Sequence, residues 1–451
     1  MNVIVIGAGL AGLAAGWRLR AAGHEVGLLE RSDRAGGRVG ADVHGSFRLP
    51  RSVETLHSGD RHLLAWIRTL GLADEMLPLR PLQIAQVYAG RSAPIDPSSL
   101  RGVAGIAGVR RRDAARLLRW PRLMARYAPL LDPTAPERAA SLDFRSAADF
   151  ARLYFGDSMY ARWVAPEVGD AFGADGESLS RVAALLLWRS RSTGRTPSAV
   201  HGVPRQPLHE LDERAAEGLD VRYGVEATRV EVRASGGFEV ACEARAGGRG
   251  ELDADAVVLA TSAAAAHRLA GSITTPPERD HLARVRVDPE IGLSLALDAP
   301  PCGLPMRVRV PRGEDQPIES LLVEPGGPGG RAPQGRGLAV LRATDRFARA
   351  NAATADDVVE KGLLGGLERL LPEAAAGIEH AVLHRRGDSR PRFDVGAYRS
   401  LDRFRRVQAD RRALGRRLYF AGDHLVGPAA EDGIVSGLRA AADLLADASG
   451  A

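Results

Sequence analysis

The chain has 451 residues, and this length predicts more than one domain because single hydrophobic cores rarely grow beyond ~250–300 residues. Hydrophobic residues make up 45% and charged residues 26%, which is typical of a globular protein, and no run of about 18 apolar residues predicts a transmembrane helix. Arginine and lysine total 61, yet Lys361 is the only lysine. Mechanisms that need a buried lysine as base, Schiff-base former or phosphate clamp are therefore all but excluded.

The net charge of +5 does not predict a nucleic-acid partner. The 56 acidic residues are spread among the arginines, and no aromatic-rich basic module is present. Cys242 and Cys302 lie far apart, which excludes a zinc ribbon, a dithiol redox motif and a disulfide scaffold. His57, Asp60 and His62 match no zinc-ligand spacing, so no metal site is expected. The first residues lack the features of a signal peptide, and we expect a cytoplasmic location.

The first 40 residues have the pattern of a βαβ unit. Residues 3–6 are a continuous β-branched run, as expected of a strand buried on both faces of a parallel sheet. A glycine-rich turn separates this run from a helical pattern over residues 13–19, and residues 25–30 predict a second strand. The unit therefore predicts the start of an α/β domain.

The turn has Gly-x-Gly-x-x-Gly spacing at Gly7, Gly9 and Gly12. Gly7 permits a tight turn, Gly9 lets the backbone approach a pyrophosphate, and Gly12 allows close helix–strand packing. The phosphates would then lie at the positive end of the helix. Glu30 ends the second strand and is placed to accept hydrogen bonds from ribose hydroxyls. Together these residues predict a dinucleotide site.

After the βαβ unit, the predicted secondary structure changes twice along the chain. Helices rich in arginine, alanine and leucine are predicted from about residue 96 to 191, and short strands return after about residue 202. A Gly/Pro-rich stretch over residues 324–331 predicts a mobile surface loop between strands. Further expected elements are strands over 221–225, 237–241 and 255–260, a helix over 355–371, a strand over 417–421 and a final helix to about 445.

An Arg-x-Gly-Gly-Arg element follows Glu30 and consists of Arg34, Gly36, Gly37 and Arg38. A second glycine pair lets another backbone turn approach a cofactor, and the two arginines can neutralise phosphate charge. With this element the sequence resembles the superfamily of flavin-containing amine oxidases and protoporphyrinogen oxidases, which includes the phytoene-type desaturases. The resemblance implies FAD as the cofactor. It would be bound without a covalent link, since neither cysteine falls in the C-terminal motif where some relatives attach it.

The resemblance continues at the C-terminal end. Residues 418–423 resemble the strand and Gly-Asp pair with which the family closes its FAD site. Residues 431–437 are similar to the protoporphyrinogen oxidase segment that opens the last helix, whose N–H groups would stabilise negative charge on reduced flavin. The residues that we expect to bind FAD are Gly7, Gly9, Leu10, Ala11, Gly12, Glu30, Arg31, Arg34, Gly36, Gly37, Arg38, Val225, Thr261, Gly422, Asp423, Asp432, Gly433 and Ile434.

The resemblance implies an α/β fold with three parts, and its weakest match covers about residues 270–385. The expected parts are a discontinuous Rossmann-like FAD-binding domain (1–48, 200–275 and 385–451), a mixed-sheet substrate-binding domain (49–95 and 276–384) and a helical insert (96–199).

The sequence departs from the family at positions that bear on chemistry. Amine oxidases carry a lysine near flavin N5, whereas Lys361 lies in an amphipathic helical pattern that predicts a solvated surface position. This favours protoporphyrinogen-oxidase-like or desaturase-like chemistry. Arg48 and Arg51 stand where the family has an acid–x–Gly sequence, so Arg51 is a candidate anchor for a substrate carboxylate or else a surface arginine. His424 is a candidate proton acceptor at the flavin edge or else a packing residue.

No second Gly-x-Gly-x-x-Gly follows a strand downstream, so no separate NAD(P)H domain is expected. We expect an FAD-dependent oxidoreductase that takes a hydride from an apolar, cyclic small molecule, with O2 or a quinone as electron acceptor. The alternatives left open are an isoprenoid or carotenoid desaturase, an amine oxidase, and a flavin-binding pathway protein without turnover.

Residues 109–127 leave two further alternatives open. Their arginines and apolar residues would suit a peripheral contact with an anionic membrane. Pro121 interrupts the helix, which favours solvated helices that cover the active site. The apolar residues in question are Leu117, Leu118, Trp120, Leu123 and Met124.

Overall fold

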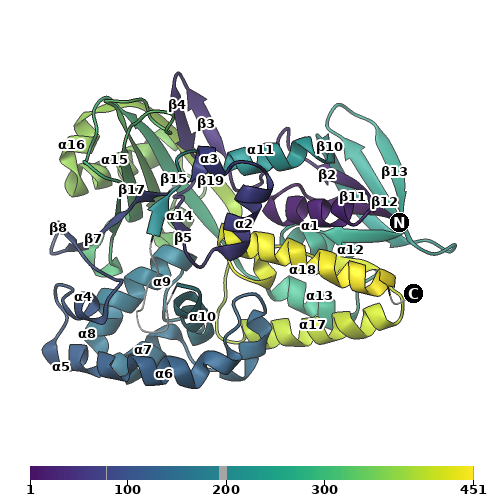
Figure 1. Ribbon diagram of the computed structural model, residues 1–451, viewed down its shortest axis with the longest axis horizontal. Helices are drawn as coiled ribbons and strands as arrows, with labels where there is room; N and C mark the ends of the chain where they lie inside the picture. The colour runs from purple at the N-terminus through teal and green to yellow at the C-terminus, as the bar shows by residue number, and fades with distance from the viewer. Residues whose placement is uncertain (78, 192–200, 450–451) are drawn as a thin grey trace.

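The computed structural model describes residues 1–77, 79–191 and 201–449, which form three parts (Figure 1). An α/β part contains both ends of the chain, a second part is built on a large mixed sheet, and a third part is helical. The N- and C-termini both lie at the outer end of the α/β part.

The α/β part is centred on a parallel sheet in which strands from the beginning, middle and end of the chain lie side by side. β1 occupies the middle of this sheet, and its Val3 and Val5 are fully buried, as the β-branched run predicts. In spatial order the five strands are β10 (Asp220–Tyr223), β2 (Glu25–Glu30), β1 (Asn2–Ile6), β14 (Ala256–Leu259) and β20 (Leu418–Phe420).

Helices cover both faces of the five-stranded sheet. One face carries α1 (Leu10–Ala21), α11 (His209–Glu217) and α18 (Ala430–Ser449). The other face carries α12 (Ala263–Ala270), α13 (Pro276–Arg284), α17 (Ala397–Ala413) and a three-stranded antiparallel sheet of β11 (Val225–Val232), β12 (Phe238–Ala244) and β13 (Arg249–Ala254).

The first and last helices of the α/β part pack directly on each other (Figure 1). A Cβ atom on Gly437 would lie 2.0 Å from the carbonyl oxygen of Ala11, so only glycine permits this approach. The N-terminal nucleotide turn is therefore completed by the last helix of the chain.

The second part is a seven-stranded mixed sheet in which only the β16–β7 pair is parallel. In spatial order its strands are β19 (Ile378–Pro391), β15 (Val287–Leu297), β18 (Gly337–Ala343), β17 (Ile318–Pro325), β16 (Met306–Arg309), β7 (Gln83–Tyr88) and β8 (Arg91–Pro94). The helices on one face are α14 (Asp345–Ala350), α15 (Asp356–Leu370) and α16 (Pro372–Ala376). Lys361 is exposed on α15, as predicted.

The opposite face of the seven-stranded sheet is covered at one end by a hairpin of β3 (Ala41–His44) and β4 (Phe47–Pro50). There Phe47 and Leu49 pack on Leu338 and Val340. The connection to the α/β part contains α2 (Arg61–Thr69), α3 (Ala73–Met76) and a small sheet of β5 (Leu56–His57), β9 (His201–Val203) and β6 (Arg80–Pro81).

The helical part has a core of aromatic rings. Trp120 contacts Trp188 with ring centroids 5.1 Å apart, and Trp163 stacks on Trp188 at 5.2 Å. Pro121 lies in the first turn of a helix, where its missing N–H costs nothing. The helices are α4 (Leu100–Ala104), α5 (Arg111–Ala114), α6 (Trp120–Tyr127), α7 (Ala147–Phe155), α8 (Asp157–Met159), α9 (Ala165–Phe172) and α10 (Arg181–Arg191).

Most of the apolar residues proposed for membrane contact face inward. Leu117, Trp120, Leu123 and Met124 belong to the core of the helical part, and only Leu118 is exposed. The described residues contain no helix that is long and apolar enough to cross a membrane.

The Gly/Pro-rich stretch connects β17 to β18, as expected of a loop between strands, and buried ion pairs hold its ends. The side chain of Arg331 is fully buried and forms ion pairs with Glu54, at 3.1 Å, and with Glu324. Because both carboxylates are also buried, the two ends of this stretch are anchored in the protein interior, while residues 325–330 between them are half-buried or exposed.

Candidate active site

A cavity of about 1370 Å³ is lined by residues of all three parts. Sites for a single small ligand usually measure roughly 300–1,000 Å³. The cavity is therefore large enough for a nucleotide cofactor together with a substrate.

The glycine turn forms one end of the cavity. Gly7 has a φ of 100°, which favours glycine, and its N–H donates to the Leu29 carbonyl oxygen at 2.8 Å. Gly9 faces open space, since an added Cβ would meet nothing within 4 Å. Gly36 lies beside Gly9 and donates its N–H to the Ala8 carbonyl oxygen at 2.8 Å. Two backbone turns thus converge on the same end of the cavity.

Glu30 lies at the carboxyl end of β2, where it lines the cavity. One carboxylate oxygen accepts a hydrogen bond from the Ala8 N–H at 2.8 Å, and the other accepts one from the Ser32 N–H at 2.9 Å. These bonds hold the carboxylate in place, and each oxygen keeps a lone pair that can accept from a ligand hydroxyl.

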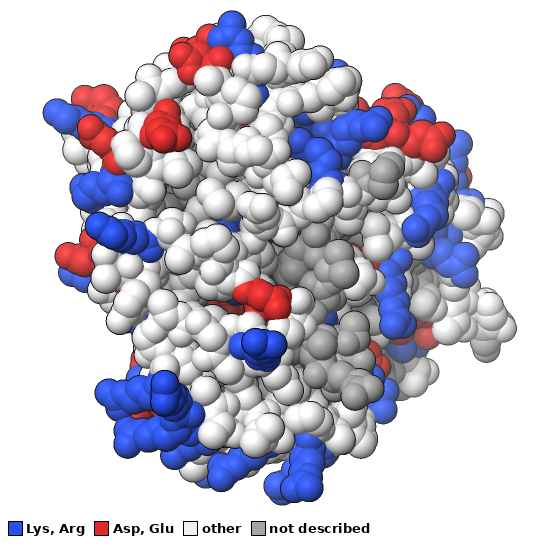
Figure 2. All heavy atoms as spheres, turned by 60° about the vertical axis from the view of Figure 1, so that its left-hand side comes forward, with Lys and Arg blue, Asp and Glu red and all other residues white. Residues whose placement is uncertain are grey.

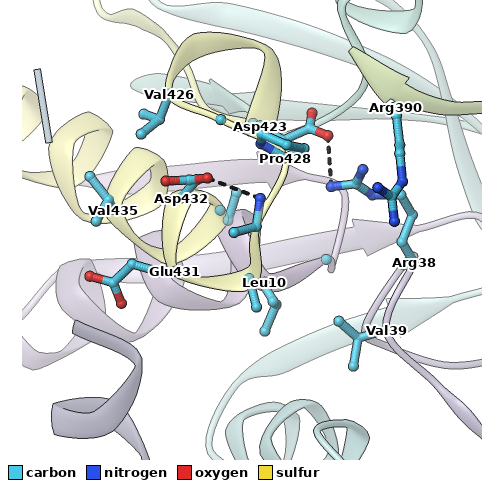
Figure 3. Close-up of a pocket in the computed structure, with 18 of the residues that line it drawn as sticks. Leu10, Arg38, Val39, Arg390, Asp423, Val426, Pro428, Glu431, Asp432 and Val435 are labelled. Atoms are coloured by element: carbon cyan, nitrogen blue, oxygen red, sulfur yellow. Dashed lines mark hydrogen bonds and ion pairs between the residues drawn. The ribbon is translucent and has the colours of Figure 1, made fainter. Parts of the chain in front are cut away.

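Arg38 joins the beginning of the chain to its end (Figure 3). One guanidinium nitrogen forms an ion pair with Asp423 at 2.6 Å, and another donates to the Ser389 carbonyl oxygen at 2.7 Å. Asp423 follows β20 and lines the cavity beside Gly422. The pair therefore fixes the loop after Gly37 against the last strand of the five-stranded sheet.

Acidic side chains gather where α18 begins. The Glu431 carboxylate accepts hydrogen bonds from the N–H groups of His62 and Leu63, at 3.1 and 2.7 Å, and so caps α2. Burial, together with Glu431 and Asp60, raises the pKa of Asp432 to about 7, although the Ala429 N–H opposes this shift. This acidic group borders the cavity on the side of the last helix.

The buried carboxyl group of Asp60 should make the stability of the folded protein depend on pH. Burial raises its pKa from 3.8 to about 7, with a further contribution from Glu431 and an opposing hydrogen bond from the His57 N–H. Because the folded protein holds this proton more tightly, the contribution of Asp60 to stability is present below about pH 4 and is lost as the pH rises through about 7. We expect Asp60→Asn to flatten the fall in melting temperature over this range.

Melting curves recorded from pH 4 to 8 test this expectation. Asp157→Asn is the matched control, because the Asp157 side chain is 77% exposed. Equal slopes for Asp60→Asn and the wild type would contradict the assignment.

Most of the residues predicted to bind FAD line the cavity. They are Gly7, Gly9, Leu10, Ala11, Glu30, Arg31, Gly36, Gly37, Arg38, Val225, Thr261, Gly422, Asp423, Asp432 and Gly433. Gly12, Arg34 and Ile434 are not among the lining residues. A Cβ on Gly12 would lie 1.9 Å from the Gly7 carbonyl oxygen, and the Ile434 side chain is in the core. The Arg34 guanidinium donates to backbone carbonyls, including that of Val39 at 2.8 Å, so it shapes the loop instead.

Neither candidate catalytic residue lines the cavity. Arg51 forms a bidentate pair with Asp42, at 2.9 and 2.5 Å. His424 is buried, and burial, with a further contribution from Arg405, lowers its pKa to about 3. Arg51 is thus paired with Asp42, and His424 is buried outside the lining of the cavity, so the structure gives neither residue a place on the cavity wall.

The other end of the cavity has two different walls. The helical part contributes apolar side chains, including Leu131, Phe172 and Leu186, together with the charged residues Asp132, Arg138, Arg189 and Arg191. The seven-stranded sheet and α9 contribute charged side chains, namely Glu290, Arg307, Arg342, Arg386, Arg390 and Asp170. Buried charges thus face the cavity on this wall, whereas apolar side chains face it elsewhere.

Sequence reasoning missed these charged residues. The one local signal is the Met-Arg-Val-Arg run of β16, in which strand alternation places both arginines on one face. The other charges come from β15, β18, β19 and the helix α9, so their convergence depends on how these distant elements pack together.

Comparisons with known proteins identify the family of this chain. The model of a family described as flavin containing amine oxidoreductase matches residues 10–445. A coproporphyrinogen III oxidase from Propionibacterium freudenreichii is 28% identical over 187 residues, which make up 41% of this chain and 34% of that protein. The chain thus matches about a third of the length of this curated relative.

Solved structures confirm the predicted α/β fold. A triple mutant of a putrescine oxidase has a TM-score of 0.78 at 19% identity, covering 99% of this chain and 98% of that chain. A cyclohexylamine oxidase from Brevibacterium oxydans has a TM-score of 0.73 at 18% identity, covering 99% of both chains. At these identities the likeness concerns the fold alone.

Proposed function

Since this chain belongs to the family of flavin-containing amine oxidoreductases and its cofactor is FAD, we propose that it oxidises a small molecule by removing a hydride from a C–H bond. Bound FAD would supply the hydride acceptor, and O2 or a quinone would take the electrons onward. The observation that carries this proposal is the cavity of about 1370 Å³, because the glycine turn lines one end of it and the other end leaves space for a substrate.

The residues at the nucleotide end fit FAD. Gly9 leaves an open cradle that a side chain would fill, and the N-terminus of α1 has no side-chain cap, so its N–H groups are available to phosphate. Glu30 offers carboxylate oxygens to a ribose. Asp423 is held by Arg38 beside the same space.

The remaining residues would position the substrate and exclude water. Phe172 and Leu186 give the helical wall an apolar surface, which supports a substrate with an apolar, cyclic body. Lys361 is exposed on α15, so no lysine faces this cavity. Protoporphyrinogen-oxidase-like or desaturase-like chemistry therefore stays favoured over amine oxidation.

The purified protein is expected to be yellow and to absorb in the flavin bands. Heat denaturation should release the flavin, which chromatography should identify as FAD, because no covalent link is expected. A colourless protein that takes up no added FAD would refute the proposed function.

The electron acceptor can be tested on the same sample. Photoreduced protein is exposed to air or to a soluble quinone, and the return of the flavin absorbance is followed together with peroxide formation. Rapid reoxidation by air with peroxide would identify an oxidase. Reoxidation by the quinone alone would identify a dehydrogenase or desaturase.

A further inference from the structure

The seven-stranded sheet, which lines the end of the cavity far from the glycine turn, brings charged residues together. Arg342 of β18 pairs across the ladder with Gly292 of β15 and Ser320 of β17, and Ser320 pairs with Arg309 of β16. The small neighbours leave room for the guanidinium groups. This arrangement is internal, whereas the outer face in Figure 2 shows its basic and acidic side chains in small scattered groups.

A first set of contacts surrounds Asp170 of α9. Arg307 donates to its carboxylate at 3.0 and 2.5 Å, and Arg309 lies 3.5 Å from the second oxygen. Arg342 donates to the Asp170 carbonyl oxygen at 2.7 Å and to the Glu319 carboxylate at 3.1 Å. Three arginines thus share two carboxylates.

A second set of contacts surrounds Glu290 of β15. The Ser389 hydroxyl donates to it at 2.5 Å, while Arg390 and Arg386 lie 3.3 and 3.6 Å from its oxygens. Burial by itself would raise the pKa of Glu290, but Arg390, Arg386 and the more distant Arg342 hold that pKa well below its usual range. Both guanidinium groups of β19 hold Glu290 by long contacts, so they keep donors for a ligand.

The two sets together contain more positive than negative charge. They comprise five arginines, Arg307, Arg309, Arg342, Arg386 and Arg390, and three carboxylates, Asp170, Glu290 and Glu319. All of these side chains are at least four-fifths buried. An arginine does not lose its proton in a protein, and a buried charge without a partner is unfavourable. The surplus of two positive charges therefore calls for an anion in the cavity.

We propose that the substrate carries at least one carboxylate, and that this group binds against Arg390, Arg386 and Arg342 at the sheet wall of the cavity. This inference rests on the proposed function, which it narrows to anionic substrates with an apolar body. Arginine suits this role because its planar donors match a carboxylate. A protonated amine would instead meet like charge at the same wall.

Ligand binding to the FAD-loaded protein tests the inference without turnover. Benzoate and isophthalate serve as mono- and dicarboxylate probes, benzamide as a neutral isostere and benzylamine as a cation. Titration calorimetry and changes in the flavin absorption spectrum report binding. We expect benzoate to bind at least tenfold more tightly than benzamide, isophthalate to bind more tightly still, and benzylamine not to bind.

Variants that remove a positive or a negative charge from this wall should change the affinity for benzoate in opposite directions, and this makes the test specific. Arg390→Met and, independently, Arg386→Met should weaken benzoate binding at least tenfold. Glu290→Gln keeps the shape of the side chain but adds to the positive surplus, so it should strengthen benzoate binding. Arg112→Met is the matched control, because Arg112 is 73% exposed, and it should leave binding unchanged. Circular dichroism and FAD content verify folding for each variant.

The experiments distinguish a failure of the carboxylate inference from a failure of the proposed function. A protein that holds FAD but binds benzoate no better than benzamide, or binds benzoate equally well as Arg390→Met and Arg386→Met, would overturn the carboxylate inference and leave the proposed function intact. A protein that takes up no FAD would overturn the proposed function.

Discussion

Gly9→Val is expected to give a folded protein that does not retain FAD. An added Cβ at Gly9 meets no protein atom within 4 Å, and its φ of −77° is accessible to any residue. The valine side chain would instead project into the space that the pyrophosphate should occupy, at the uncapped start of α1. We expect the affinity for FAD to fall by about a hundredfold or more, since displaced phosphates lose several charge-assisted hydrogen bonds.

The measurements are the ratio of flavin to protein absorbance after purification, and a titration of the apoprotein with FAD. Gly303→Val is the matched control, because Gly303 is exposed and an added Cβ there also meets nothing within 4 Å. Gly12→Val should behave differently, since its Cβ would lie 1.9 Å from the Gly7 carbonyl oxygen and would disturb the fold itself. Full FAD retention by Gly9→Val would show that the pyrophosphate does not lie at this turn.

Arg331→Met is expected to lower the free energy of unfolding by about 3–5 kcal/mol, the usual cost of removing one partner from a buried ion pair. The Arg331 side chain is fully buried between Glu54 and Glu324, which are also buried. Without the guanidinium, Glu54 would lose its ion-pair partner in the protein interior, whereas Glu324 would keep its pair with Arg80. Adding Glu54→Gln to the variant should recover part of the loss by removing the unpaired charge.

Urea and thermal unfolding of the apoprotein measure this effect. Arg336→Met is the control from the same connection, because the side chains of the Arg336–Glu379 pair are 43% and 38% exposed and the pair should contribute only about 0–1 kcal/mol. If the two variants were equally stable, Arg331 would not anchor the stretch after β17.

The sequence was sufficient for the parts of the site that depend on local spacing. The Gly7–Gly9–Gly12 turn, Glu30 at the end of β2 and the start of α18 all follow from neighbouring residues. For such motifs the backbone conformation and the exposed N–H groups are set within one turn or one strand. The resemblance to a known family added the Arg38 and Asp423 segments, which the structure joins by an ion pair.

The remaining features depend on partners that are distant in the chain. Composition predicted a mobile loop around Arg331 but not its ion pair with Glu54, which is 277 residues away. Alternation along β16 could place Arg307 on the same face as Arg309, yet only the strand order brings them to Arg342. His424 was expected at the cavity because Asp423 is there, but adjacent side chains can point in opposite directions.

β1 lies between β2 and β14 in the five-stranded sheet, and this position affects how the chain folds during synthesis on the ribosome. β1 is synthesised well before its neighbour β14, which begins at Ala256, and before α18, which packs on α1 and begins at Ala430. The N-terminal segment must therefore wait for nearly the whole chain before its sheet and its nucleotide turn are complete. Loading of the cofactor is consequently a late event, and nascent chains expose apolar strands that chaperones would need to protect.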